Sequence, residues 1–312
     1  MKKTIALLAG GISSEREVSL KSGQQVYEAL DKTKYEVRRY DPQTDLPRLV
    51  AEAAEIDAAL IILHGPYGED GTLQGLLELL DIPYQGTGVL GSALAMNKLA
   101  SKQMYEKAGL PVPDYVVVTR ESPGDTGPML QRLGLPLVVK PVCAGSSIGM
   151  SIVRAADGLA PALSKAFEHD ATAIVERFVK GTEITVGVLG NASLQALPVI
   201  EIVPGEDHEF FDYSAKYTPG ATREICPARI DAAAAQKAQE YAQIAHRALY
   251  CKGYSRTDMI ICGPDIFILE TNTIPGMTPT SLFPQAAQAA GISFGQLLDR
   301  LIELGIQAHR QR

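Results

Sequence analysis

The sequence predicts an α/β protein whose N-terminal part is a doubly wound parallel sheet. Two apolar segments, residues 4–9 and 58–63, have the length and continuous hydrophobicity of strands buried on both faces. Each is followed by a helical pattern, and strands that alternate with helices are typical of parallel sheets. Ligands collect at the carboxyl ends of such strands. Because Gly10-Gly11 and His64-Gly65 stand at these ends, we expect a ligand site there.

The first helix is expected to begin at a capping box, Ser14-Glu15-Arg16-Glu17, and to extend to about Leu30. A second helix is expected over residues 72–80. Residues 1–9 superficially resemble a signal peptide, but two glycines end the apolar run after five residues and charged residues follow at once. We therefore interpret the segment as a buried strand and assign the first unit to residues 1–97.

Two further units are expected. A long helix over residues 88–108 leads into the second unit, residues 98–183. Its strands are expected at 116–119, 137–140, 150–153 and 173–178, with helices near 125–133 and 157–169. The third unit, residues 184–312, is expected to contain strands at 184–189 and 194–202, a polar loop at 204–222, a helix at 231–250, a hairpin and a C-terminal helix.

The composition limits the class of protein. The 312 residues carry a formal net charge of −7, which argues against a general nucleic-acid binder but allows a local basic pocket. No apolar stretch is long enough to span a bilayer. The four cysteines show neither CxxC spacing nor clustering with histidine, as expected of thiols in a reducing compartment. We expect a cytoplasmic protein.

Two strand patterns near the C-terminus flank the turn-forming tripeptide Gly263-Pro264-Asp265. Arg256 and Asp258 share one face of the first strand, and Glu270 and Asn272 share one face of the second. If the hairpin is centred on the middle of the tripeptide, the two acids face each other, which is unfavourable without a cation between them. Carboxylates and an amide oxygen are ligands that Mg²⁺ accepts. A metal site and an exposed sheet face with another register both remain open.

A strand that ends at Lys140 leads into a loop of small residues over 144–149. Backbone N–H groups in such a loop can approach an anion closely, and the lysine adds positive charge. A flexible hairpin tip is the alternative. Other candidates also have an ordinary interpretation, as a solvated lysine, a surface acid, a helix-terminus acid or a structural histidine: Lys98, Lys216, Glu176, Glu183, Glu15 and His64.

Six motifs then stand in order along the chain. They are residues 10–19 (GGISSEREVS), 64–71 (HGPYGEDG), Lys140-Pro141 with Gly145-Ser146-Ser147, Phe211-Asp212-Tyr213 with Ala215-Lys216-Tyr217, residues 254–258 (YSRTD), and Glu270-Thr271-Asn272 with residues 275–278 (PGMT). With these motifs the chain resembles the D-alanine–D-alanine ligases of the ATP-grasp superfamily over essentially its whole length. It departs from their pattern at Asn97, where an acid often stands, and at Val142-Cys143-Ala144, which replaces a more polar loop start.

The resemblance implies three domains, with ATP bound between the central and C-terminal ones. Residues that match the family's ATP contacts are Lys98, Lys140, Lys216, Glu176, Phe178, Val179 and Glu183. Those that match its Mg²⁺ ligands, where Mn²⁺ is also possible, are Asp258, Glu270 and Asn272. Those that match its substrate and catalytic residues are Glu15, His64, Ser146, Tyr217, Arg256, Gly276, Ser281 and Leu282.

The activity implied is ATP-dependent ligation of two D-alanine molecules through an acyl phosphate, for peptidoglycan precursor synthesis, by a homodimer. Arg256 and the backbone of Gly276 would stabilise the oxyanion, and the loop at 204–222 would act as a lid. Two alternatives are a ligase that joins D-alanine to D-lactate, against which Tyr217 argues, and an ATP-grasp protein that binds nucleotide without catalysis. The complete set of Arg256, Asp258, Glu270 and Asn272 argues against the second.

Overall fold

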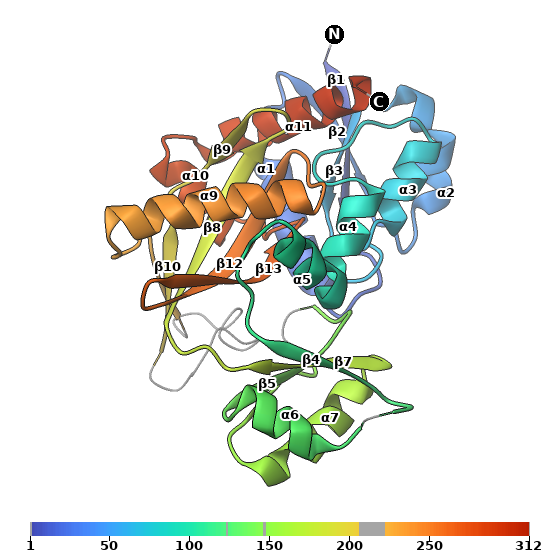
Figure 1. Cartoon of the computed structure of the whole chain (residues 1–312). Coiled ribbons are helices and arrows are strands. Elements are labelled where there is room, and N and C mark those ends of the chain that lie inside the picture. The colour runs from blue at the N-terminus through green and yellow to red at the C-terminus, as the bar shows by residue number, and fades with distance from the viewer. Residues whose placement is uncertain (1, 123, 146–147, 206–221, 312) are drawn as a thin grey trace.

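The protein is described here from a computed structural model that covers residues 2–122, 124–145, 148–205 and 222–311. The described residues form three β-sheets, one parallel and two antiparallel, with helices packed around them (Figure 1). The α/β class predicted from the sequence is confirmed. Residues 211–217, which carry one of the six motifs, lie outside the described residues, as does Ser146.

The first sheet is parallel, with strand order β2-β1-β3. Its elements are β1 (Lys3–Ala9), α1 (Arg16–Ala29), β2 (Tyr35–Tyr40), α2 (Leu46–Ala51), a short 3-10 helix (Ala53–Glu55), β3 (Ala58–Ile62) and α3 (Thr72–Leu79). The two apolar strands were predicted from the sequence. The edge strand β2 was not, because Arg38 and Arg39 interrupt its apolar pattern. Gly10 and His64 stand just beyond β1 and β3, as expected.

The expected capping box at the start of the first helix does not form. The residue before α1 is Glu15, and its side chain caps no backbone group. Instead, Ser13 Oγ accepts a hydrogen bond from the Glu15 N–H at 3.2 Å and donates one to the His64 carbonyl at 2.7 Å. Gly10 and Gly11 both have positive φ, and a Cβ on Gly10 would lie only 2.7 Å from the Asp41 carboxylate. The glycine turn thus brings Glu15 next to the end of β3.

The long helix expected over residues 88–108 is two helices, α4 (Val89–Met96) and α5 (Lys98–Lys107). The break falls at Asn97, whose backbone is extended and whose side chain accepts a hydrogen bond from the Ala100 N–H at 2.9 Å. Asparagine is a good N-cap because its side-chain oxygen satisfies a backbone donor of the first turn. Lys98 therefore begins a new helix.

The second sheet is antiparallel, with strand order β4-β7-β5-β6. Its elements are β4 (Tyr115–Thr119), α6 (Thr126–Leu133), β5 (Leu137–Pro141), β6 (Ser151–Val153), a 3-10 helix (Ala156–Gly158), α7 (Leu159–Phe167) and β7 (Thr172–Arg177). All four strands and both α-helices agree with the expected positions to within two residues. Figure 1 shows this sheet with α6 and α7 below the rest of the molecule.

The third sheet has strand order β11-β10-β8-β12-β13, with β9 paired to β8. Its elements are β8 (Thr182–Gly190), β9 (Leu194–Ala196), β10 (Ile200–Pro204), β11 (Thr222–Ile225), α9 (Ala232–Ala248), β12 (Tyr254–Cys262), β13 (Asp265–Asn272), α10 (Leu282–Ala289) and α11 (Phe294–Arg310). The single strand expected over 194–202 is two strands, β9 and β10. The single C-terminal helix expected is also two, α10 and α11.

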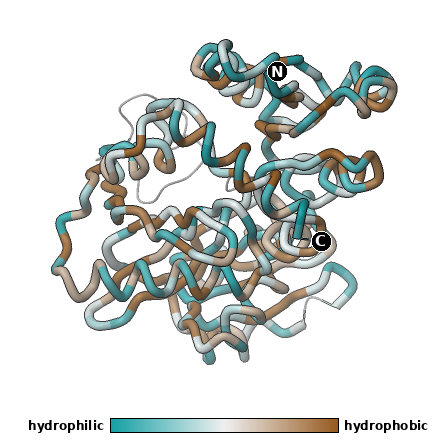
Figure 2. The backbone as a smooth tube through the Cα atoms, turned by 90° about the horizontal axis from the view of Figure 1, so that it is seen from above, coloured by the Kyte–Doolittle hydropathy of each residue, from teal (hydrophilic) through white to brown (hydrophobic). Residues whose placement is uncertain are grey.

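The first and third sheets share one hydrophobic core, in which Ile5 and Leu60 from the first pack with Phe283 and Leu298 from the C-terminal helices. The second sheet has a separate core, built around Val139. Figure 2 shows hydrophobic and hydrophilic residues interleaved along the helices, as expected of helices with one buried face. Among the described helices, none combines the length and apolar character needed to cross a bilayer.

Candidate active site

The hairpin β12–β13 places Asp258 opposite Glu270 and Arg256 opposite Asn272, as predicted from the sequence. The route to this register differs from the expectation. The turn has two residues, Gly263 and Pro264, because Cys262 already pairs with Asp265. Gly263 has a φ of +60°, which suits the first central position of a type II′ turn.

A β-bulge restores the predicted pairing. From the two-residue turn, Met259 pairs with Ile268, so a regular ladder would pair Asp258 with Leu269. The register shifts between Asp258 and Met259, and Leu269 is the extra residue. Consecutive residues of a regular strand point to opposite faces, yet Leu269 and Glu270 line the same cavity. The bulge therefore directs the Glu270 carboxylate toward Asp258, which is a recurrent use of bulges beside active sites.

Asp258 is held by three neighbouring side chains. Its Oδ1 accepts from Arg256 Nε at 2.9 Å and its Oδ2 from Arg256 Nη2 at 2.8 Å. Thr185 Oγ1 donates to Oδ1 at 2.5 Å, and Asn272 Nδ2 donates to Oδ2 at 3.2 Å. Burial alone would lower the pKa of Arg256, but the charge and hydrogen bonds of Asp258, together with the charges of Glu270 and Glu69, outweigh it and the pKa is raised. The guanidinium stays charged, and its Nη1 edge is not used by Asp258.

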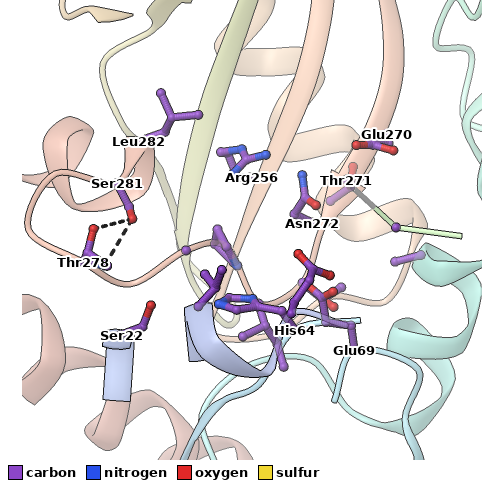
Figure 3. Close-up of a pocket in the computed structure, with 18 of the residues that line it drawn as sticks. Ser22, His64, Glu69, Arg256, Glu270, Thr271, Asn272, Thr278, Ser281 and Leu282 are labelled. Atoms are coloured by element: carbon purple, nitrogen blue, oxygen red, sulfur yellow. Dashed lines mark hydrogen bonds between the residues drawn. The ribbon is translucent and has the colours of Figure 1, made fainter. Parts of the chain in front are cut away.

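Arg256 and Glu270 open onto a cavity of about 820 Å³. Figure 3 shows the side chains of His64, Glu69, Arg256, Asn272 and Ser281 around it. The predicted residues that line this cavity are Glu15, His64, Lys98, Arg256, Glu270, Asn272, Gly276, Ser281 and Leu282. These come from the ends of β1 and β3, from α5, and from the hairpin with the loop that follows it. The cavity thus collects residues from motifs far apart in the sequence.

Glu15 and His64 lie side by side where the parallel strands end, and both are buried. Burial lowers the pKa of His64, Arg256 lowers it further and Glu15 opposes the shift, so the imidazole is neutral at pH 7. A Cβ on Gly145 would lie 3.8 Å from Glu15 Oε2, and one on Gly65 would lie 3.2 Å from it. The glycine loop after Lys140 therefore comes close to Glu15.

The other end of the cavity is formed by the loop that leads into α10. Ser281 Oγ accepts a hydrogen bond from the Thr278 N–H at 3.2 Å, and Ser281 is the residue before the helix. The Ser281 side chain makes no capping hydrogen bond to the first turn of α10, which begins at Leu282. Backbone N–H groups and the helix dipole make such a terminus suitable for a carboxylate. Ser281 and Leu282, which were expected among the substrate and catalytic residues, lie at this terminus.

A second, narrower cavity of about 130 Å³ lies between the second and third sheets. It is lined by all the predicted nucleotide residues that the structure describes: Lys98, Lys140, Glu176, Phe178, Val179 and Glu183. Lys98, Ala144 and Glu270 line both cavities, so the two meet there. Lys98 Nζ donates to the Ala144 carbonyl at 2.5 Å and lies 3.9 Å from Glu270 Oε2. Lys216 and Tyr217 lie outside the described residues.

The residues at the junction are compatible with a divalent cation. In the described part of the chain, no three His, Cys, Asp or Glu side chains come close enough to hold a metal on their own. The hairpin offers two carboxylates on directly opposed residues and one amide, the donor type that Mg²⁺ takes alongside phosphate oxygens. Arg256 at present neutralises Asp258, and a cation would share that carboxylate.

Comparison of the sequence with known proteins identifies the family of the chain. Its residues 104–303 match the family model described as the D-ala D-ala ligase C-terminus, and residues 4–47 and 38–87 match the D-ala D-ala ligase N-terminus. The chain belongs to the D-alanine–D-alanine ligase family. A D-alanine–D-alanine ligase of Syntrophobacter fumaroxidans is 66% identical over 306 residues, with 98% of each chain covered. One of Desulfotalea psychrophila is 56% identical, covering 97% of this chain and 95% of the relative.

Solved structures agree with this assignment. The D-alanine–D-alanine ligase of Bacillus anthracis complexed with ATP superposes with a TM-score of 0.87 at 36% identity, and 99% of each chain is covered. The VanG D-Ala:D-Ser ligase of Enterococcus faecalis gives a TM-score of 0.85 at 35% identity, covering 98% of this chain and 100% of that one. The ligase fold, of the ATP-grasp type, is therefore the fold of this chain.

Two residues of this site were not predicted from the sequence. Lys102 is fully buried and reaches Glu176, and Glu69 lines the first cavity. The spacing of Lys102, one helical turn after Lys98, was a usable signal, because residues four apart on a helix share a face. Glu69 belongs to a motif already noted, but nothing in its spacing indicated that the carboxyl group points inward.

Glu69 leads to a prediction about pH and stability. Removal from water raises the pKa of Glu69 to about 8, although its Oε2 accepts from the Gly65 N–H at 2.7 Å, and Glu15 and Glu270 add to the shift. The ordinary value is 4.5, so the folded protein binds an extra proton between these values and loses stability as pH rises through this window. In Glu69→Gln this loss should be absent. Urea unfolding midpoints compared from about pH 5 to pH 9 test this, and parallel pH profiles for variant and parent would contradict it.

Proposed function

We propose that the chain joins two D-alanine molecules to D-alanyl-D-alanine, with conversion of ATP to ADP and phosphate, and so supplies a peptidoglycan precursor. The observation that carries the proposal is the junction of the two cavities at Lys98, Ala144 and Glu270. A nucleotide in the narrow cavity would direct its terminal phosphate toward a carboxylate held in the wide one. Family membership and the ATP complex of a relative at 36% identity support it.

The narrow cavity is the proposed nucleotide site. The backbone and side chains of Phe178 and Val179, at the passage from β7 to β8, would hold the adenine, with Glu176 and Glu183 nearby. Lys98 and Lys140 would contact phosphate oxygens, together with Lys216. In phosphoryl transfer the protein acts mainly by positioning and by charge stabilisation, which lysines at this junction can supply. The central unit, residues 98–183, would thus provide most of the nucleotide site, next to units 1–97 and 184–312.

The first substrate is proposed to lie between Glu15 and Arg256. Its ammonium group would pair with the Glu15 carboxylate, and its carboxylate would face the Nη1 edge of Arg256 and the Gly276 N–H. A carboxylate oxygen attacks the γ-phosphorus, the bond between this phosphorus and the ADP oxygen breaks, and an acyl phosphate forms. Asp258, Glu270 and Asn272 would hold Mg²⁺, or Mn²⁺, which when bound neutralises phosphate charge.

The second step forms the peptide bond. The second substrate would bind by its carboxylate at Ser281 and at the N-terminus of α10, which begins with Leu282. Its amine attacks the acyl carbon, the bond from this carbon to the phosphate oxygen breaks, and the amine nitrogen loses a proton. Arg256 and the Gly276 N–H would stabilise the oxyanion of the tetrahedral intermediate. Ser146 and Tyr217 would connect to Glu15 and close the site against water, which would otherwise hydrolyse the acyl phosphate.

The decisive experiment measures phosphate release with D-alanine, L-alanine, D-serine and D-lactate, alone and in pairs. We expect D-alanine alone to support rapid turnover with D-alanyl-D-alanine as product. Dominant formation of a mixed product with D-lactate or D-serine would assign the second site to another nucleophile. ATP binding without turnover for any of these substrates would indicate a non-catalytic nucleotide-binding protein.

We also propose a cytoplasmic homodimer. All four cysteines lie in the described part of the chain and are free thiols, which suits a reducing compartment. Leu79 and Leu90 are 87% and 58% exposed on neighbouring helices α3 and α4, with exposed Tyr250 close to Gly91. Apolar residues grouped on a surface mark interaction sites. Light scattering should give twice the 33.5 kDa mass of one chain, and cell fractionation tests the location.

A further inference from the structure

Helix α5 contributes more to the nucleotide site than its first residue, Lys98. One turn further along, the Lys102 side chain is fully buried, and its Nζ lies 3.2 Å from Glu176 Oε1. Lys140 Nζ lies 2.9 Å from the same oxygen. Two buried lysines, from α5 and β5, therefore share one buried carboxylate, from β7. Of these three charged residues, Lys140 and Glu176 line the cavity proposed for the nucleotide, and Lys102 lies behind them.

Glu176 is the main charge that offsets Lys102. The Lys102 ammonium has no hydrogen-bond partner of normal geometry among the described residues, and the Tyr115 ring centroid is 5.3 Å from it. Burial lowers the pKa of Lys102 and Lys140 adds to this, while Glu176 and, more weakly, Glu106 oppose it. Burial alone would raise the pKa of Glu176, but the two lysines outweigh it and lower the pKa. The carboxylate is therefore ionised between its two partners.

The number of charges in this group has a consequence for anion binding. A lysine paired one-to-one with a carboxylate forms a neutral pair, which attracts a phosphate only weakly. Two ammonium groups on one carboxylate leave one net positive charge, and attraction between charges is strong where water is excluded. Of the two lysines, Lys140 is the one at the cavity surface. The net charge is thus presented where a nucleotide would place its phosphates.

We propose that Lys102 is a positioning residue that offsets the charge of Glu176, so that Lys140 keeps a net positive charge for the phosphates of the nucleotide. The proposal rests on the proposed function, which places ATP in this cavity. A purely structural role, in which Lys102 only ties α5 to β7, would affect every ligand of the cavity alike. A role through charge would affect ligands according to their number of phosphates.

The experiment measures Kd for adenosine and for ATP by calorimetry at fixed Mg²⁺. The quantity compared between variants is the adenosine Kd divided by the ATP Kd. This ratio isolates the contribution of the triphosphate, because losses in adenine binding cancel. Lys102→Met makes the group neutral, and the ratio should fall about tenfold, which corresponds to about 1.4 kcal/mol. Glu176→Gln removes the negative charge and leaves at least the positive charge of Lys140, so the ratio should not fall below that of the parent. Lys102→Met/Glu176→Gln leaves one positive charge, and the ratio should return close to that of the parent.

The double variant also guards against a folding failure of Lys102→Met, because its ratio can be compared with that of Glu176→Gln alone. Tyr105→Phe is the matched control. Tyr105 is buried on the same helix and donates to Thr271 Oγ1 at 2.8 Å, so its change removes a buried polar contact without changing charge. Its ratio should equal that of the parent. Equal ratios in all variants would overturn the proposal, whereas a parent protein that binds no ATP would overturn the proposed function instead.

Discussion

Replacing Arg256 by lysine is expected to lower kcat by about 10²–10³-fold, the usual loss when one oxyanion donor is removed. Lysine keeps a positive charge beside Asp258, so the fold should survive. It cannot reproduce the fork that holds both Asp258 carboxylate oxygens at 2.9 and 2.8 Å while another edge would face the proposed substrate. Because the lost contact is strongest in the transition state, KM for D-alanine should change much less than kcat.

The chain offers a matched control for this variant. Arg229 holds Glu201 through the same two groups, with Nε to Oε2 at 2.9 Å and Nη2 to Oε1 at 2.6 Å. Neither residue lines either of the two cavities described above. Arg229→Lys should therefore leave kcat within about threefold of the parent, since the half-exposed Arg229 lies away from both cavities. Steady-state kinetics of the two variants decide the matter, and equal kcat values for both would remove Arg256 from the oxyanion role.

Glu270→Gln is expected to raise the Mg²⁺ concentration needed for half-maximal rate by at least about 100-fold. Even substitution of a residue that only contacts a metal ligand commonly lowers metal affinity about 10–100-fold. The amide keeps the shape of the side chain, so the register of β12 and β13 should be retained. Binding of Mn²⁺ with ADP, followed by electron paramagnetic resonance, gives a readout that does not depend on turnover.

Asp265→Asn serves as the control for Glu270→Gln. It removes one carboxylate from the same strand, but Asp265 is exposed at the tip of the hairpin, where it pairs with Cys262. Its metal dependence should match that of the parent. The assignment of Glu270 as a ligand fails if its variant binds Mn²⁺ as tightly as the control does.

Much of the architecture could be predicted because it depends on local pattern. Continuous apolar runs predicted β1 and β3, and the turn-forming residues 263–265 predicted the hairpin. The errors arose where a neighbour in space decides the outcome. Ser14 offers a capping box by spacing, but Ser13 reaches the His64 carbonyl instead and sets the entry to α1. Asn97 ends α4 because its side chain caps α5, and the apolar pattern across it gave no sign of this.

The sequence predicted which residues belong to the candidate site, but not which of their side chains contact each other. Motif order predicted which residues lie at the cavities, and every one of those that the structure describes lines one of them, or both. The pairing of Arg256 with Asp258 and the sharing of Glu176 by two lysines depend on side-chain geometry across sheets. Neither periodicity nor spacing contains that information. Lys102 illustrates the limit, because its spacing indicates a helix face shared with Lys98 but not that its ammonium group is buried beside Glu176.

The bulge at Leu269 decides which face of the hairpin carries the proposed metal ligands of β13. With the two-residue turn and no bulge, a regular ladder over the same residues would pair Asp258 with Leu269 and turn Glu270 and Asn272 to the other face, while leaving the sheet equally well paired. Such a chain would keep its sheet and lose its ligand set. A designer who transfers this hairpin to another antiparallel scaffold must therefore copy the irregularity along with the acids.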